Sequence, residues 1–286
     1  MNKKHIALIT SIKWNIPTRC DKILAEELRK EGIQTDIVSW EKSCIWKSYD
    51  LIILRSCWDY HLYYKAFCHW LSELKATGIA VANGVSQIET NIDKEQQLRL
   101  LRNRNIPVIP SVVCTSIESA RNFFEKEYLG CAVIKPSISA SGYRTAVVRN
   151  EKELIRQARD ILKDDKKIIL QPFIDTVCNG EISMIFFHGV FSHAVRRYPG
   201  VTVVGRSPVP IDEPMTEWLE VASAVCREIS AESMLYVRID MIEYHSEIYV
   251  MEVELAEPDL YLNLEYGTES KPLKKFVEHI RREINL

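Results

Sequence analysis

Short apolar runs alternate with amphipathic stretches along the first third of the chain. Runs rich in Ile, Leu and Val have the length of buried strands and predict strands over residues 5–11, 35–40, 50–55 and 79–82. Two stretches between these runs repeat apolar residues every three to four positions, which predicts helices over 21–31 and 65–76. Strands that alternate with helices are typical of a parallel sheet, so we expect a small α/β domain over residues 1–88.

The regular alternation is lost in the rest of the chain. Helical periodicity is found at residues 94–104, 116–126, 152–163, 214–229 and 271–284. Strands are expected at residues 131–135, 144–149, 167–172, 181–188 and 190–197. We therefore expect a second domain over residues 89–286, with α+β character in the C-terminal half of the chain.

The apolar runs at residues 236–254 carry acidic residues where a core strand should have none. Residues two apart on a strand face the same side, so Glu252 and Glu254 should point together. A three-residue loop at 245–247 would place Asp240 opposite Glu252 and Arg238 opposite Glu254. Three neighbouring carboxylates repel one another, and a bound Mg²⁺ would remove that repulsion. A hairpin with one solvated, charged face is the alternative, and the pattern alone leaves both open.

Composition narrows the class of protein. The chain has 286 residues, of which 47% are hydrophobic and 27% charged, and a formal net charge of −2. This charge gives no electrostatic reason to expect nucleic acid or an anionic membrane as a partner. Eight cysteines without a Cys-x-x-Cys pair are typical of free thiols, and the first apolar run is too short for a signal peptide or a membrane span. We therefore expect a cytoplasmic protein that binds neither nucleic acid nor a membrane.

Motifs of the common nucleotide-binding loops are absent, but other residues could hold a nucleotide. The chain has no Gly-x-x-x-x-Gly-Lys-Ser/Thr loop and no Gly-x-Gly-x-x-Gly turn. Lys94 lies in the first turn of a predicted helix, where a bound phosphate would offset its conflict with the helix dipole. Lys135 precedes a loop of small residues, in which Ser141 and Gly142 could contact phosphate oxygens. A solvated lysine and a surface turn are the ordinary alternatives.

Two strand ends add candidates for contacts with nucleoside and substrate. The backbone at Gln171, Phe173 and Ile174 could contact an adenine edge, and Glu181 could accept hydrogen bonds from ribose hydroxyls. Arg196 and Arg197 end a strand and point to opposite faces, so only one should reach a site and bind a substrate carboxylate. A further cluster follows the third strand, where ligands bind in open α/β sheets: Arg55, Trp58, Asp59 and Tyr60. We expect Asp59 to pair with a substrate ammonium, whereas packing between domains is the alternative for the two aromatic residues.

The order of these residues resembles the ATP-grasp superfamily, in its glutathione synthetase and D-alanine–D-alanine ligase branch. The segments 55–60, 191–196 and 252–258 look like the subgroup of ATP-grasp ligases that belongs to cycloserine biosynthesis. The resemblance covers nearly the whole chain. It implies an N-terminal pre-ATP-grasp domain of parallel α/β type, a lid subdomain at about 95–170 and a catalytic subdomain at 171–286. ATP would be clasped between two antiparallel sheets.

The resemblance also implies roles for individual residues. Asp240, Glu252 and Glu254 would bind Mg²⁺ or Mn²⁺, although asparagine is common in the family at the last position. The nucleotide would be bound by Lys94, Lys135, Ser141, Gly142, Gln171, Phe173, Ile174 and Glu181. We expect Arg238 and Arg196 to be catalytic, with Arg238 stabilising the transferring phosphoryl group; an ion pair with Glu254 is the alternative for Arg238. Substrate contacts are expected from Arg55, Trp58, Asp59, Tyr60 and Arg197.

The family's reaction joins a carboxylate to an amine through an acylphosphate, with release of ADP. We therefore expect a carbon–nitrogen ligase that acts on an amino acid or small peptide in a biosynthetic pathway. A small-molecule phosphotransferase and a non-catalytic ATP-binding regulator are the alternatives. The sequence leaves open which acid and amine react, whether they belong to one molecule, and whether the chain forms a homodimer.

Overall fold

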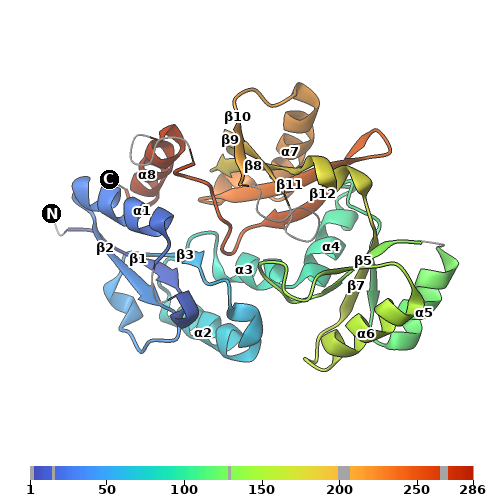
Figure 1. Ribbon diagram of the computed structural model, residues 1–286. Helices are drawn as coiled ribbons and strands as arrows, with labels where there is room; N and C mark the ends of the chain where they lie inside the picture. The colour runs from blue at the N-terminus through green and yellow to red at the C-terminus, as the bar shows by residue number, and fades with distance from the viewer. Residues whose placement is uncertain (1–2, 15–16, 128–129, 199–206, 265–269, 286) are drawn as a thin grey trace.

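The computed structural model describes residues 3–14, 17–127, 130–198, 207–264 and 270–285, in which the chain forms three sheets (Figure 1). The first sheet is parallel, and its strand order is β2-β1-β3. Its elements are β1 (His5–Thr10), α1 (Arg19–Lys30), β2 (Gln34–Ser39), β3 (Leu51–Ser56) and α2 (Tyr64–Thr77). Alternate residues of β1 face opposite sides, so Ile6 and Leu8 pack with α1 whereas Ala7 and Ile9 pack with α2. The strand predicted at 79–82 is wrong, because Val81 forms only an isolated bridge with Ile52.

Two short helices lead from this unit to the second sheet. They are α3 (Val85–Asn91) and α4 (Lys94–Asn103), and the side chain of Asp93 caps the start of α4 by accepting from the Glu95 N–H. The sheet is antiparallel, in the order β4-β7-β5-β6. Its elements are β4 (Val112–Cys114), α5 (Ile117–Lys126), β5 (Ala132–Pro136), β6 (Ala146–Val148), α6 (Glu151–Leu162) and β7 (Ile168–Pro172). The apolar faces of α5 and α6 close one side of the sheet, which leaves its other side for the site described below.

The third sheet is also antiparallel, in the order β10-β9-β8-β11-β12. Its elements are β8 (Glu181–Phe187), β9 (Val190–Arg197), β10 (Val209–Ile211), α7 (Thr216–Glu228), β11 (Val237–Tyr244), β12 (Glu247–Glu254) and α8 (Lys271–Glu283). On β8, Ile182, Met184 and Phe186 pack against α7. The opposite face carries Glu181 at one end and Phe187 at the other, and Phe187 packs against Phe276 of α8. One face of this sheet is therefore apolar where α8 covers it and polar at the far end.

The hairpin β11–β12 has the predicted register but not the predicted turn. The turn contains two residues, His245 and Ser246, both at positive φ, so the expected three-residue loop is wrong. The register shifts next to Asp240, so that Met251 is an extra residue on β12. This bulge compensates for the shorter turn, and Asp240 pairs with Glu252 as predicted. Without the bulge Met251 would lie opposite Asp240, and Glu252 would point to the other face.

Most other predicted elements agree with the structure to within a few residues. The sequence pattern did not predict α3, β4 or β10, each of which has seven residues or fewer. Five short 3-10 helices in the described part of the chain were also not predicted: Ile12–Trp14, Trp46–Ser48, Tyr60–Leu62, Asp175–Asn179 and Ala231–Ser233. The domain boundary near residue 88 and the division near 170 stay predictions. In the part of the chain that the structure describes, no helix has the length and apolar character that a membrane span needs.

Candidate active site

A cavity of about 880 Å³ is lined by both antiparallel sheets and by the segment that follows β3. Many residues proposed from the sequence line it: Trp58, Tyr60, Lys94, Lys135, Ser141, Gly142, Gln171, Phe173, Ile174, Glu181, Arg197, Arg238, Glu252 and Glu254. The loop after β5 lies close to the N-terminal unit, because the Tyr60 hydroxyl donates to Ser139 O (3.4 Å). The Lys94 N–H donates to Ser137 O (2.9 Å), which joins the start of α4 to the same loop. The tertiary fold thus brings together residues that are far apart in the sequence.

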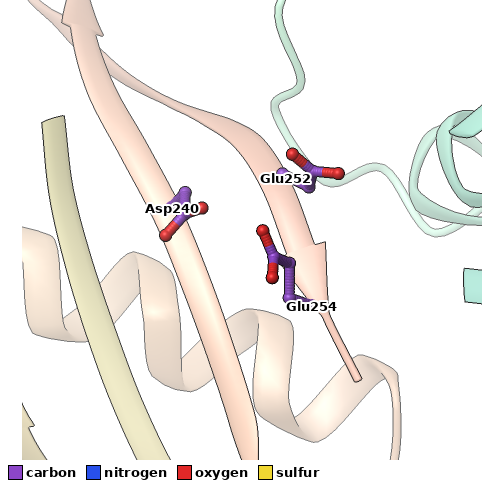
Figure 2. Close-up of side chains that lie close together, drawn as sticks. All are labelled: Asp240, Glu252 and Glu254. Atoms are coloured by element: carbon purple, nitrogen blue, oxygen red, sulfur yellow. The ribbon is translucent and has the colours of Figure 1, made fainter. Parts of the chain in front are cut away.

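Three carboxylates meet on adjacent strands at the edge of this cavity. Figure 2 shows Asp240 on β11 and Glu252 and Glu254 on β12, with the three side chains close together. One oxygen from each of the three lies within 4.8 Å of the others. Asp240 is fully buried, whereas Glu252 and Glu254 retain 24% and 22% exposure. The bulge at Met251 is the local reason for this arrangement, since it puts both glutamates on the face of Asp240.

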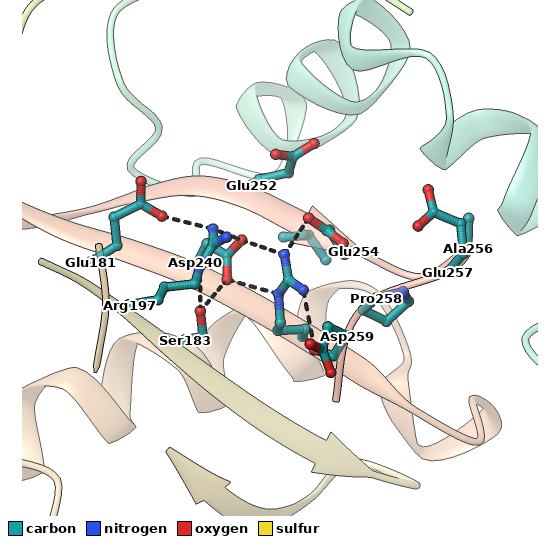
Figure 3. A network of polar contacts seen from close by, with 12 residues as sticks. Glu181, Ser183, Arg197, Asp240, Glu252, Glu254, Ala256, Glu257, Pro258 and Asp259 are labelled. Carbon is teal, nitrogen blue, oxygen red and sulfur yellow. Dashed lines mark hydrogen bonds and ion pairs between the residues drawn. The ribbon is translucent and has the colours of Figure 1, made fainter. Parts of the chain in front are cut away.

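Each of the three carboxylates has a basic partner, and Figure 3 shows Arg197 beside Asp240 and Glu181. Arg197 Nη2 lies 2.5 Å from Asp240 Oδ2 and 2.7 Å from Glu181 Oε2. Arg238 bonds to both Asp240 oxygens at 3.0 Å and also pairs with Glu254. Lys94 pairs with Glu252. The acidic cluster is therefore neutralised by side chains of the protein itself.

These partners decide the protonation of the acids. Burial alone would raise the pKa of Asp240, but Arg197 and Arg238 outweigh burial and lower the pKa. Burial is likewise outweighed at Glu252, where Lys94 and Lys135 lower the pKa. At Glu254 burial prevails and, with the like charges of Glu252 and Asp240, raises the pKa to about 7 despite Arg238. The cluster thus contains two firmly ionised carboxylates and a third that titrates near neutrality.

The cluster fits a hard divalent cation such as Mg²⁺. All three groups offer carboxylate oxygens, which Mg²⁺ prefers, and they lie close enough to share one ion. Basic side chains in the same cavity could then bind the phosphates that usually complete a magnesium site in nucleotide enzymes. Asp240 can serve as a ligand once Arg197, Arg238 or Ser183 gives up its contact with this carboxylate.

The remaining nucleotide candidates lie on β5, on the following loop and on β7. Lys135 is partly buried, and burial lowers its pKa although Glu252 acts in the opposite direction. Ser141 and Gly142 both have positive φ, and among the residues that the structure describes no atom lies within 4 Å of the position that a Gly142 Cβ would occupy. The backbone of this loop is therefore open to a ligand. The Phe173 N–H donates to Cys131 O (3.0 Å), and the Gln171 side chain donates to Ser111 Oγ (2.7 Å).

Three residues expected at the site do not line the cavity. Arg55 is buried, and its guanidinium donates to Asp21 (3.2 Å) and to Pro258 O (3.4 Å). Asp59 is also buried, at 2% exposure, and burial raises its pKa. Arg196 donates to Asn179 O (3.0 Å) at the surface, whereas the neighbouring Arg197 reaches the cavity. Only one of the two arginines faces the cavity, as strand geometry predicted.

The sequence did not point to several polar residues in the cavity wall, of which Glu257 is the most buried carboxylate. Asn91, Ser139, Thr145, Tyr198, Asp259 and Tyr261 also line the cavity. Burial raises the pKa of Glu257 well above its usual range, and the negative charge of Glu254 adds to this. A signal for Glu257 was present, because the residue lies between apolar residues in the segment 252–258 that carried the family resemblance.

Comparison with known proteins agrees with this architecture. Residues 6–83 match the family described as the N-terminal domain of D-cycloserine synthetase DcsG. The cycloserine biosynthesis protein DcsG of Streptomyces lavendulae is 24% identical over 269 residues, which cover 84% of this chain and 86% of that protein. The crystal structure of D-cycloserine synthetase DcsG superimposes with a TM-score of 0.86 at 21% identity, over 98% of this chain and 99% of that one.

A second solved structure extends the similarity to another ligase. D-alanine–D-alanine ligase from Bacillus anthracis, complexed with ATP, superimposes with a TM-score of 0.70 at 19% identity, over 100% of this chain and 99% of that one. The chain has the ATP-grasp fold. The predicted fold class and the predicted resemblance to ATP-grasp ligases are confirmed. The individual roles of the site residues stay predictions.

Proposed function

We propose that this chain is an ADP-forming ligase that uses ATP and Mg²⁺ to join a carboxylate to an amine, with an amino acid or small peptide as substrate. The observation that carries the proposal is the group of three carboxylates within 4.8 Å at a cavity lined by Lys94, Lys135, Arg197 and Arg238. Alternating acids and bases of this kind suit a phosphorylated ligand and its metal. The relatives with the same fold are named as a synthetase and a ligase, which supports the reaction class.

The proposed nucleotide site uses the two antiparallel sheets. Lys94 and Lys135 bind phosphate oxygens, and the open backbone at Ser141 and Gly142 covers them. The adenine lies against Phe173 and Ile174, next to Gln171, and Glu181 accepts from the ribose. When bound to Asp240, Glu252 and Glu254, Mg²⁺ supplies positive charge that neutralises the terminal phosphates.

In the proposed reaction, an oxygen of the substrate carboxylate attacks the γ-phosphorus, and the bond from that phosphorus to ADP breaks. The amine then attacks the acyl carbon of the resulting acylphosphate, phosphate leaves, and the amine loses a proton. Arg238 lies between Asp240 and Glu254, so it is placed to stabilise the transferring phosphoryl group. The sequence suggested Arg196 as the second catalytic arginine. We assign that role to Arg197 instead, because of the two only Arg197 lines the cavity.

The test is a screen for ADP release from ATP and Mg²⁺ with amino acids and dipeptides, offered singly and in pairs. Mass spectrometry of the product should show one molecule of water lost for each ADP and phosphate formed. A product that retains phosphate identifies a phosphotransferase instead. Nucleotide binding without ADP release for any pair identifies a regulator, and either result refutes the proposed ligase.

Asp240→Asn should lower ADP release by more than about 100-fold, because it removes a charged metal ligand. The same change leaves Arg197 and Arg238 less compensated, so we also expect the apo protein to lose about 3 kcal/mol of stability. Thermal unfolding must therefore accompany the assay, which is run well below the midpoint of the variant. Glu125→Gln, on the exposed side of α5, is the control and should change neither quantity.

A further inference from the structure

Glu257 places a buried carboxylate in the cavity wall, outside the contacts that join the acidic cluster to Arg197 and Arg238. Its residue is 8% exposed, and its side chain has no hydrogen bond or ion pair with the residues that the structure describes. In Figure 3 it lies apart from Glu181, Arg197 and Asp240 and from the contacts drawn between them. Lys94 is close enough to act on it electrostatically, but the Lys94 ammonium is paired with Glu252. The ionised form of a buried carboxyl is unfavourable without a partner, which suggests that a ligand supplies the partner of the ionised form.

The main chain holds Glu257 in this position from both sides. Trp58 Nε1 donates to Glu257 O (3.0 Å), and the Tyr236 hydroxyl donates to Ala256 O (2.9 Å). On the other side of Glu257, Arg55 donates to Pro258 O (3.4 Å). These contacts keep the segment from turning its carboxylate out into water. A binding group fixed in this way is pre-organised for its ligand.

The surroundings of Glu257 suit a small cation. Trp58 and Tyr60 line the same cavity, and aromatic faces attract ammonium groups. Glu257 follows Glu254 by three residues, so at most about 10 Å of chain separates it from the acidic cluster. A molecule of amino-acid size can therefore place one end at Glu257 and its other end near Arg238.

We propose that Glu257, together with Trp58 and Tyr60, binds the ammonium group of an amino acid whose carboxylate lies at Arg238. This inference rests on the proposed ligase function and adds the class of its acid substrate. The ammonium does not react; its ion pair with Glu257 fixes the direction of the carboxylate and excludes acids without an amino group. Glu257 thus takes the role that the sequence suggested for Asp59, which does not line the cavity.

The experiment measures binding in the presence of Mg²⁺ and the ATP analogue AMPPNP. Calorimetric titrations use the twenty standard L-amino acids, D-alanine and D-serine, and then the deaminated analogue of the tightest ligand. Wild-type protein should bind the amino acid more tightly than its analogue. Glu257→Gln should weaken binding of the amino acid by about 10- to 150-fold, the worth of a charge-assisted contact, and leave the analogue unchanged. Glu125→Gln is the matched control and should behave as wild type.

A second readout separates a binding role from a structural one. Burial raises the pKa of Glu257, so burying this acid costs stability at neutral pH, and Glu257→Gln should raise the melting temperature of the apo protein, whereas a structural role predicts that it falls. Glu257→Asp keeps the charge and should retain part of the preference for the amino acid. The inference is overturned if Glu257→Gln binds the amino acid as wild type does, if it weakens AMPPNP binding instead, or if wild type binds no amino acid. Failure of the ligase proposal looks different, because amino acids would then bind without any release of ADP from ATP.

Discussion

Lys94 links the predicted metal site to the predicted phosphate site. Removing its charge should therefore strengthen the binding of Mg²⁺ and weaken the binding of nucleotide. In the structure Lys94 pairs with Glu252, a candidate metal ligand. A metal at Glu252 must displace Lys94, and a phosphate at Lys94 must displace Glu252. Each ligand therefore prepares the site of the other, so Mg²⁺ and nucleotide should bind with positive coupling. Lys94→Met removes the charge and keeps a side chain of similar length.

The magnitudes follow from the geometry of the pair. Two unit charges about 4 Å apart attract by about 4 kcal/mol at an effective dielectric constant of about 20. The Lys94 and Glu252 side chains keep 15% and 24% exposure, and water at the site weakens this attraction, so we take about 1–2 kcal/mol as the part that a metal must overcome. Lys94→Met should therefore tighten Mg²⁺ binding in the absence of nucleotide by about 5- to 30-fold. The same change should weaken ADP binding in the absence of metal by about 1.5–3 kcal/mol, through loss of a charge-assisted contact.

Calorimetry tests both signs in separate titrations, with Mg²⁺ alone and with ADP in the presence of EDTA. Lys167→Met is the matched control, because Lys167 pairs with Glu95 (2.5 Å) at the surface and does not line the cavity. It should leave both affinities unchanged. If Lys94→Met binds Mg²⁺ no more tightly than wild type, Lys94 does not compete with the metal at Glu252, and the reasoning fails.

Two further predictions concern buried bases. Lys135→Met should weaken ADP binding by about 1.5–3 kcal/mol, which calorimetry checks. The same change should raise the melting temperature of the apo protein, because burial lowers the Lys135 pKa and so opposes its charge. A lower melting temperature in thermal unfolding would contradict this account. Burial lowers the pKa of His193 to about 4, so the unfolded state binds more protons between about pH 6.5 and 4, and stability should fall as the pH decreases through that window. The loss of stability from this residue is at most about 3 kcal/mol. Urea unfolding at pH 7 and 4.5 should give a smaller difference in unfolding free energy for His193→Gln than for wild type or for His69→Gln, a change at an exposed histidine. Equal differences in all three proteins would contradict the assignment.

The sequence by itself determined most helices and strands and the composition of the site. Apolar periodicity predicted these elements because each buries one face or stripe, and that requirement is visible in a single segment. The acids at Asp240, Glu252 and Glu254 were recognisable because charged residues interrupt strands that are otherwise apolar. Strand alternation also predicted that only one of Arg196 and Arg197 would reach the cavity.

Other features depended on contacts between distant segments. The opposition of Asp240 and Glu252 was predicted from a three-residue turn, but it arises from a two-residue turn together with a bulge at Met251. A local pattern cannot distinguish these solutions, because both give the same pairing near the acids. The helix α3 and the strands β4 and β10 are too short for periodicity to reveal, and they form because neighbouring elements offer them hydrogen bonds and apolar surface.

Only the tertiary structure decided which carboxylate faces the cavity beyond the acidic cluster. Asp59 and Glu257 are both acids next to apolar or aromatic residues, and the sequence favoured Asp59 because it follows a strand end. In the fold Asp59 is buried away from the cavity, whereas Trp58 donates to the backbone of Glu257 and holds it in the cavity wall. That contact joins residues 199 positions apart. Long-range packing of this kind decides whether a ligand can reach a buried carboxylate, and no local pattern of residues contains that information.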